Sequence, residues 1–371
     1  MTSMRILMIA TGAYTSGGGE KHVLDLSTGL IDRGHHVMLM APGGGDVLDV
    51  AAQLGCDVRE APSLSAFSCK AAHSLAHLRE TWKPDIVHAH GPRAAYVVRR
   101  GDTGSIPRLV YTNHGIHAGH GLLGGIKLAV ERADVDKVAA YITTCEADKT
   151  ESAKLGILIP ERTAVVYNGV PVPTEVEKGR FRAELALDSD TSLALHVGRA
   201  NLQKDHSTLL QAFDATWRSV TRKPKLVMIV GGSDTQRAHL KRQTFKLACG
   251  DDVIILEPRV SLAEAYTDAD LFVLSSLWEA RPYVLVEAMQ YGCPVVSTDV
   301  GGVAEAVEDG VTGLLTPAKD ARALADAMTA LLDDGERRMS MGQAAQRSMV
   351  GRFTLDEMVD QTIAVYRQVS K

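Results

Sequence analysis

Short apolar runs alternate with longer amphipathic runs along most of the chain, and this alternation predicts repeated strand and helix units. The first apolar run, RILMIA, leads through the glycine-rich loop TGAYTSGGG to a helix from Glu20, in which apolar residues such as Val23 and Leu30 share a face. Gly34 ends this helix, and HHVMLMAP resumes a strand. The pattern predicts a β-α-β unit of a parallel sheet.

The alternation continues in two series that a polar, proline-containing segment separates. Residues 1–170 also contain the strand-like runs DIVHAH, RLVYTNHG, AAYITTC and TAVVYNGV, which predict one doubly wound domain. The segment NGVPVPTEVEKGR is predicted to be a linker. Residues 171–351 then contain SLALHVG, a helix at about 205–220, KLVMIVGG, DVIIL, ADLFVLSS and CPVVST, which predict a second domain of the same type.

The last twenty residues, RFTLDEMVDQTIAVYRQVSK, are expected to form a closing helix. They begin with a capping-box pattern from Thr354 to Glu357. Met358, Ile363 and Tyr366 then form an apolar series. These three residues are predicted to be the buried stripe of the helix.

Composition narrows the class of protein. A chain of 371 residues exceeds what one core usually supports, and 45% hydrophobic with 23% charged residues is ordinary for a soluble globular protein. The five cysteines are scattered and show no CxxC spacing, which favours a reducing cytoplasm over a disulfide framework or a zinc ribbon. No apolar stretch is long enough for a signal peptide or a membrane span. The expected location is cytoplasmic.

The distribution of charge argues against a nucleic-acid partner. Residues 1–170 hold 17 basic and 17 acidic side chains, so the net charge of −5 lies in the second half. Neither half has a basic stripe. A local patch of Arg93, Arg99, Arg100 and Arg108 leaves a weak peripheral membrane contact open.

Two loops have the chemistry of phosphate sites. In SGGGE, successive glycines before a helix allow backbone N–H groups to approach a phosphate, although a plain tight turn explains the pattern as well. In VGRANLQKDHSTLL, Arg199 and Lys204 follow a strand that ends at Gly198. Two cations there suit a diphosphate, and an exposed pair on a loop is the alternative.

Two glutamates flank a strand-to-helix connection in SSLWEARPYVLVEAM. Glu279 is expected on the loop after the strand, and Glu287 in a helix that starts at Pro282 and ends before Gly292. Ligands bind at this edge of open α/β sheets. Glycosidases also use carboxylate pairs, but a pair beside a diphosphate cradle suits the vicinal diols of a nucleotide sugar.

Seven segments in this order resemble the retaining glycosyltransferases of family 4: SGGGE, HAHG, TNHG, YNGV, GRANLQK, EARPYVLVEAM and PVVSTDVGGVAEAV. The resemblance covers nearly the whole chain. It implies an α/β fold of the GT-B type, with two Rossmann-like doubly wound parallel-sheet domains facing a central cleft. Residues 1–170 would bind the acceptor and 171–351 the nucleotide sugar, while residues 352–371 would return to the first domain, with hinges in the linker and near Gly351.

The resemblance also implies residue roles. Arg199 and Lys204 would hold the donor's diphosphate, Glu287 the ribose hydroxyls, and Glu279 would face the hydroxyls of the transferred sugar. His114 would lie near C6 of that sugar. The catalytic set is therefore His114, Glu279, Arg199 and Lys204.

Backbone groups would complete the donor site. Gly17 and Gly18 would lend N–H groups near the distal phosphate, and Arg259 and Val260 match a stretch whose backbone contacts the base. The N–H groups that would reach the sugar belong to Ala280, Arg281, Pro282 and Tyr283. Glu257, Ala280 and Arg281 depart from the family pattern, and they leave the choice of donor open.

The implied reaction moves a sugar, with retention of anomeric configuration, from a nucleoside-diphosphate sugar to a hydroxyl group. By family frequency the donor is UDP-GlcNAc or UDP-glucose, and the acceptor is a saccharide, a lipid-linked molecule or a small molecule. The resemblance implies no protein nucleophile, no resident cofactor and no metal. The alternatives left open are a sugar-nucleotide epimerase of the same fold and a non-catalytic subunit that binds a nucleotide sugar.

Histidines offer a competing hypothesis of a zinc site. His88 and His90 share a strand face, and His114, His117 and His120 follow a later strand. The spacing does not specify a tetrahedral set, so the expectation is that the chain holds no metal.

Two further patterns are expected to be structural or inert. Asp268 and Asp270 form the DxD motif that other glycosyltransferases use for metal binding, but here it meets a strand, which favours a structural role. His22, His35 and His239 are expected to be exposed and without function.

Overall fold

The chain divides into two units, which we describe separately. In the computed structural model, the first unit comprises Met1–Gly169 with Phe353–Lys371, and the second comprises Val170–Arg352. These boundaries lie within one residue of those expected from the sequence. The residues that the structure describes are 3–15, 17–61, 69–101, 108–115, 121–259 and 261–370.

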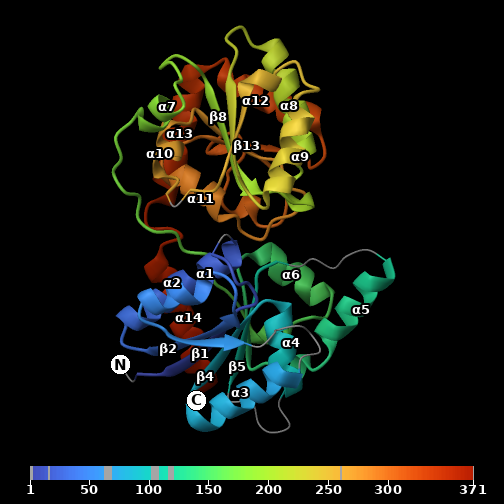
Figure 1. Ribbon diagram of the computed structural model, residues 1–371, viewed down its shortest axis with the longest axis vertical. Coiled ribbons are helices and arrows are strands. Elements are labelled where there is room, and N and C mark those ends of the chain that lie inside the picture. The colour runs from blue at the N-terminus through green and yellow to red at the C-terminus, as the bar shows by residue number, and fades with distance from the viewer. Residues whose placement is uncertain are drawn as a thin grey trace. The chain divides into compact units, whose positions relative to one another are not determined.

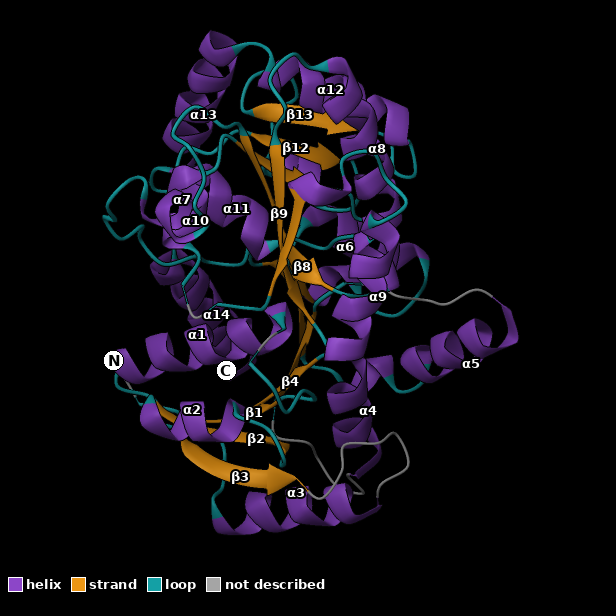
Figure 2. Ribbon diagram, turned by 45° about the horizontal axis from the view of Figure 1, so that its top comes forward, coloured by secondary structure: helices purple, strands orange, loops and turns teal. Residues whose placement is uncertain are grey.

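The described part of the first unit contains a seven-stranded parallel sheet in the order β3-β2-β1-β4-β5-β6-β7. Figure 2 shows β3, β2, β1 and β4 following one another across this sheet. Chain order reverses between β1 and β4, as in a doubly wound fold. The strands are β1 (Arg5–Ile9), β2 (His36–Pro42), β3 (Asp57–Ala61), β4 (Ile86–His90), β5 (Leu109–Asn113), β6 (Ala140–Thr143) and β7 (Thr163–Val165).

Helices cover both faces of this sheet. Successive strand residues point to opposite faces, so Ile6 and Met8 pack with α1, α2 and α14, whereas Leu7 and Ile9 pack with α3 and α4. The sheet is therefore buried on both sides. The helices are α1 (Gly18–Asp32), α2 (Val47–Gln53), α3 (Cys69–Thr81), α4 (Pro92–Gly101), α5 (Gly121–Arg132), α6 (Glu146–Lys154) and α14 (Leu355–Ser370).

The C-terminal helix α14 is part of the first unit. The expected stripe of Met358, Ile363 and Tyr366 is buried in the core that the helix shares with α1. Figure 1 shows α14 in red beside the blue α1. Thr354 caps the helix, because its Oγ1 accepts a bond of 3.1 Å from the backbone N–H of Glu357.

The sequence pattern does not predict two edge strands, β3 and β13. In β3, DVREA, only Ala61 is buried, so the apolar alternation that marks a strand is weak. It forms a strand because its backbone pairs with β2 along a register that begins at Met38 opposite Asp57. Edge strands are commonly charged and short, which hides them from pattern analysis.

The described part of the second unit contains a six-stranded parallel sheet in the order β10-β9-β8-β11-β12-β13. Its strands are β8 (Leu193–Arg199), β9 (Lys225–Gly231), β10 (Val253–Leu256), β11 (Leu271–Leu274), β12 (Val295–Thr298) and β13 (Gly313–Thr316). Its helices are α7 (Arg180–Glu184), α8 (His206–Ser219), α9 (Asp234–Thr244), α10 (Ala263–Asp268), α11 (Tyr283–Gln290), α12 (Ala321–Leu332) and α13 (Gly335–Met349).

Two helices that border the candidate site start at slightly different residues from those predicted. Helix α1 begins at Gly18, two residues before Glu20, so glycines of the loop form its first turn. Helix α11 begins at Tyr283, because Pro282 is extended and its carbonyl accepts the first bonds of the helix, from the N–H groups of Leu285 and Val286. Gly292 follows the end of α11 with φ +72°, in the left-handed conformation expected of such a stop.

The two aspartates of the DxD motif, Asp268 and Asp270, accept hydrogen bonds from backbone N–H groups. The Asp268 carboxylate accepts bonds from the N–H groups of Gly179, Phe181 and Arg182 at 2.6, 2.8 and 3.1 Å. Asp270 accepts from the backbone of Leu193 and pairs with Arg182 at 2.6 Å. Both carboxylates therefore connect α7 and β8 to the strand β11.

The basic patch in the first unit contains an arginine that faces inward. Arg99 is 1% exposed, and its guanidinium donates to the carbonyls of Glu131 and Ala133 at 3.0 and 3.1 Å. It cannot present its charge to a membrane surface, so that expectation was wrong for Arg99. No helix in the described part of the chain is both long and apolar enough to span a membrane.

Candidate functional site

In the second unit, a buried ion pair connects the loops that follow β8 and β11. The Lys204 Nζ lies 2.5 Å from Oε1 of Glu279, and these residues are 9% and 8% exposed. The same Oε1 accepts from Ser276 Oγ at 2.6 Å, and Gln203 Nε2 donates to the other oxygen at 3.3 Å. Sequence reasoning singled out the lysine and the glutamate but missed Gln203 and Ser276, because neither belongs to the spacing of the two glutamates.

Gly198 makes room for this lysine. A Cβ at Gly198 would lie 3.1 Å from Lys204 Cγ and 3.0 Å from His196 Nε2, which is closer than nearly all real contacts. Arg199, the next residue, is exposed at the end of β8. Lys204 is therefore held by the Glu279 carboxylate, whereas Arg199 is exposed on the surface at the same strand end.

Glu287 lies half-buried at the start of the second turn of α11, which follows the loop that carries Glu279. Its Oε2 accepts a bond of 3.1 Å from the hydroxyl of Tyr266, a fully buried residue of α10. Burial and the neighbouring Glu287 carboxylate raise the pKa of the Tyr266 hydroxyl well above its ordinary value, so the hydroxyl stays a donor. The tyrosine orients the carboxylate and was not predicted from the sequence.

The loop after Glu279 packs against the glycines of PVVSTDVGG. The carbonyl of Ala280 accepts a bond of 2.9 Å from the N–H of Gly302. Gly301 has φ +54°, and a Cβ there would collide with the Glu279 carbonyl oxygen. Arg281, which departs from the family pattern, is 3% exposed, so its side chain lies inside the unit. The backbone of residues 280–283 is held by this glycine pair.

The predicted base-contacting stretch is only partly described. The guanidinium of Arg259 binds both carboxylate oxygens of Glu184, at 2.8 and 2.7 Å, and lies over the ring of Phe181. This pairing anchors the loop that follows β10 to α7, which carries Glu184. Val260 lies outside the described residues, as do His117 and His120. Glu257, which departs from the family pattern, is exposed and pairs with Arg237.

In the first unit, the glycine loop and His114 come together. Gly17 is the extended N-cap of α1, and no side chain caps the helix there. The helix begins with N–H groups that have no intrahelical partner. A Cβ at Gly19 would lie 4.0 Å from Cδ2 of His114. The N-terminus of α1 and the imidazole thus border the same point at the carboxyl edge of the sheet, and a helix N-terminus can bind an anion.

His114 belongs to a cluster of histidines that spans three elements. His90 Nδ1 lies 3.2 Å from His114 Nε2, and the His22 ring packs edge-on against His114 with centroids 4.8 Å apart. His88 lies beside His90, held by the hydroxyls of Tyr366 and Thr112, each at 2.6 Å. The prediction that His22 is exposed was wrong, since it is 1% exposed. The sequence signal that could have indicated its burial is the position of His22 early in the helix that follows the glycine loop.

The prediction was also wrong for His35, which is buried and accepts a bond of 3.1 Å from the N–H of Met4. His239 is exposed, as expected. Burial lowers the pKa of His22 to about 4 and holds the pKa of His88, His90 and His114 well below the ordinary value. The cluster is therefore neutral at physiological pH.

The second unit contains a buried histidine pair that predicts acid sensitivity. His196 and His206 meet through their Nε2 atoms at 3.1 Å, and burial lowers the pKa of His206 from 6.5 to about 4. Because the unfolded chain binds this proton more readily, stability should be constant above pH 6.5 and fall as pH drops from 6.5 toward 4. The expected loss from His206 is about 3 kcal/mol.

This expectation is tested by measuring the free energy of unfolding in urea across that pH range. His206→Asn should show a shallower decline than the unchanged protein. An equal decline in both proteins would mean that His206 does not contribute to the acid sensitivity.

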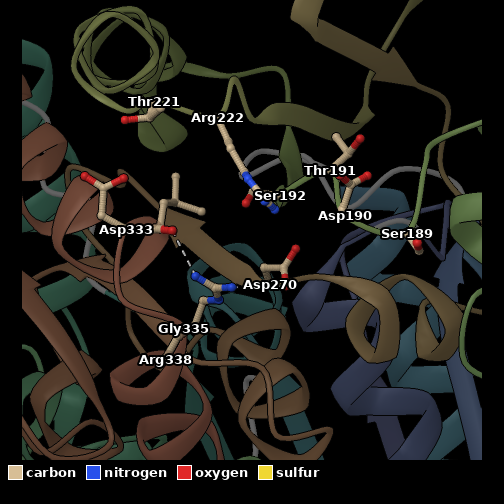
Figure 3. A pocket seen from close by; sticks show the side chains of 11 residues that line it. Ser189, Asp190, Thr191, Ser192, Thr221, Arg222, Asp270, Asp333, Gly335 and Arg338 are labelled. Carbon is tan, nitrogen blue, oxygen red and sulfur yellow. Dashed lines mark hydrogen bonds and ion pairs between the residues drawn. The ribbon is translucent and has the colours of Figure 1, made fainter.

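A separate cavity of about 670 Å³ lies in the second unit, at the amino ends of its strands. Figure 3 shows Arg222, Asp270 and Arg338 around it. The Arg338 guanidinium donates to the carbonyls of Leu331 and Leu332 at 2.8 and 3.0 Å, and Asp270 anchors β8. These groups hold the unit together at the sheet edge opposite Glu279, and the cavity is not part of the candidate site.

The two halves of the chain match two known families. Residues 16–172 match the family described as Glycosyltransferase Family 4, and residues 177–348 match the family described as Glycosyl transferases group 1. The chain is 29% identical to a D-inositol 3-phosphate glycosyltransferase of Xylanimonas cellulosilytica, over 97% of this chain and 94% of that protein. It is 30% identical to an alpha-maltose-1-phosphate synthase of Mycolicibacterium smegmatis, over 67% of this chain and 68% of that protein.

Solved structures share the fold. The Anabaena protein HepE in complex with UDP-glucose superimposes with a TM-score of 0.84 and 21% identity, over 98% of this chain and 100% of that chain. The expected fold class, α/β with two Rossmann-like parallel-sheet domains of the GT-B type, is confirmed.

Proposed function

This chain belongs to the family 4 glycosyltransferases, and we propose that it transfers a sugar, with retention of anomeric configuration, from a nucleoside-diphosphate sugar to an acceptor hydroxyl. The observation that carries the proposal is the buried pair of Lys204 and Glu279 at the strand ends of the second unit. We assign the lysine to the diphosphate and the carboxylate to the sugar hydroxyls. An ammonium has three N–H donors, so the lysine can hold Glu279 and still bind phosphate oxygens.

In the proposed reaction the bond between the anomeric carbon and the diphosphate oxygen breaks. The acceptor oxygen bonds to the same face of that carbon, and its proton passes to the leaving phosphate. Arg199 and Lys204 stabilise the charge that develops on the diphosphate. His114 and Glu279 orient the sugar. No side chain is required as a nucleophile, and none is assigned.

We assign the donor to the UDP-sugars, with UDP-glucose and UDP-GlcNAc as the first candidates. The support is the structural likeness to HepE, which was solved with UDP and with UDP-glucose. The acceptor class is a saccharide, a lipid-linked molecule or a small molecule with a hydroxyl group. Release of free nucleoside diphosphate only when an acceptor is present would separate a transferase from an epimerase or a non-catalytic binding subunit.

Glu287→Ala should weaken binding of UDP by about 1–3 kcal/mol, because the ribose hydroxyls lose a charged acceptor. Isothermal titration calorimetry of the unchanged protein and the variant measures this difference. Glu336→Ala, which alters an exposed glutamate at the start of helix α13, is the matched control and should bind UDP normally. An unchanged affinity in Glu287→Ala would remove this residue from the ribose site.

Transfer should survive exhaustive chelation, because Arg199 and Lys204 take the place of a divalent cation at the departing diphosphate. The measurement is the initial rate before and after dialysis against EDTA. Loss of activity that magnesium or manganese restores would contradict this assignment and return attention to Asp268 and Asp270.

A further inference from the structure

Three imidazoles of the first unit converge at the carboxyl edge of its sheet. His22 comes from α1, His90 ends β4, and His114 directly follows β5. One nitrogen of each ring can be chosen so that the three atoms lie within 4.8 Å of one another. The positions come from three separate elements of a packed sheet-and-helix core, so the backbone fixes the convergence.

The hydrogen bonds around these rings suit metal ligands. His22 Nδ1 lies 3.0 Å from the Oδ1 of Asn168, an acceptor, which sets the tautomer with the proton on Nδ1 and the lone pair on Nε2. His90 is 3% exposed, and its Nε2 has no hydrogen-bond partner among the described residues.

One pair of these nitrogens already has the spacing of ligands on a small, nitrogen-preferring cation. Zinc binds histidine nitrogens at about 2.0–2.1 Å, which puts two nitrogens of a tetrahedral site roughly 3.3 Å apart. His90 Nδ1 and His114 Nε2 are 3.2 Å apart, so a shared ion could replace their hydrogen bond without moving either ring far. The three ligands are neutral nitrogens, which favour zinc, cobalt, nickel or copper over magnesium or calcium.

We propose that His22, His90 and His114 form a binding site for a divalent transition-metal ion of the zinc class, with a fourth ligand that these residues do not supply. This ion is distinct from one that would neutralise the donor's diphosphate. Resting on the proposed function, the site is inhibitory, because an ion on His114 removes the imidazole from the transferred sugar. Chelation is then expected to preserve transfer, and added zinc to suppress it.

Cobalt and zinc titrations of the full chain test the site without relying on activity. Cobalt(II) should give the intense visible absorption of a tetrahedral nitrogen site, and zinc should abolish it by displacement. His22→Gln and His90→Gln should lose the cobalt spectrum, and Asn168→Ala should weaken zinc binding by about 10- to 100-fold. His239→Gln, which changes an exposed histidine of α9, should bind cobalt as the unchanged protein does.

The outcomes separate the parts of the proposal. Absence of the cobalt spectrum in the unchanged protein, or its persistence in both His22→Gln and His90→Gln, overturns the site. Circular dichroism identifies a variant that has not folded, and Asn168→Ala then provides the decisive binding measurement. Metal binding without loss of transfer overturns the inhibitory role alone. Failure to transfer from any donor in metal-free buffer counts against the proposed function and leaves the binding result intact.

Discussion

Lys204→Met is expected to lower kcat for sugar transfer by about 100- to 1,000-fold, the usual effect of removing one group that stabilises charge in a transition state. The variant removes the buried cation and leaves the Glu279 carboxylate with Ser276 and Gln203 as neighbours. A buried carboxylate without its ion-pair partner also destabilises the fold, by about 3–5 kcal/mol. The rate of nucleotide release with saturating donor measures the first effect, and urea unfolding the second.

Lys241→Met is the matched control, because Lys241 is an exposed residue of α9. It should retain both the rate and the stability of the unchanged protein. Lys204→Arg keeps the charge but changes the shape, and it should recover part of the stability and little of the rate. A kcat for Lys204→Met within a factor of three of the unchanged enzyme would exclude this lysine from the diphosphate site.

A chain that ends at Arg352 is expected to have no stably folded first unit. Helix α14 buries five apolar side chains in the core of that unit: Met358, Val359, Ile363, Val365 and Tyr366. Their burial contributes on the order of 10 kcal/mol. A typical domain has a total free energy of unfolding of only about 5–15 kcal/mol, so the loss is comparable to the whole.

Limited proteolysis with mass spectrometry measures this result, because the first unit should be digested while the second unit persists. Ile363→Ala is the milder companion, with an expected loss of about 2–5 kcal/mol in an intact chain. Glu357→Ala is the control on the exposed side of the same helix. A truncated protein that resists proteolysis and transfers sugar at the full rate would overturn the structural role of α14.

Much of the fold is decided by local patterns that the sequence carries openly. The runs RILMIA and SLALHVG are mostly apolar on both faces, so they predict buried parallel strands without any knowledge of their neighbours. Gly292 and Thr354 mark helix ends through backbone and side-chain chemistry that acts over a few residues. The linker after residue 170 was predicted from its prolines and charges, whereas the return of the chain near Gly351 was implied by the family resemblance.

The tertiary structure decided which residues that are far apart in the chain pair with one another. Lys204 and Glu279 were separate predictions, and only the adjacency of β8 and β11 brings their charges to 2.5 Å. His22 and Arg99 have the polarity of surface residues, yet the packing of α1 and α4 buries them beside partners that the sequence does not indicate.

The sequence by itself therefore determined the two doubly wound units, their boundaries and the positions of the glycine loops and the paired glutamates. These features depend on interactions within a strand, a helix or a turn. The histidine cluster, the orientation of Glu287 by Tyr266 and the edge strand β3 were decided only by the tertiary structure. Each of them depends on which elements become neighbours, because a contact between residues far apart in the chain leaves no local pattern in the sequence.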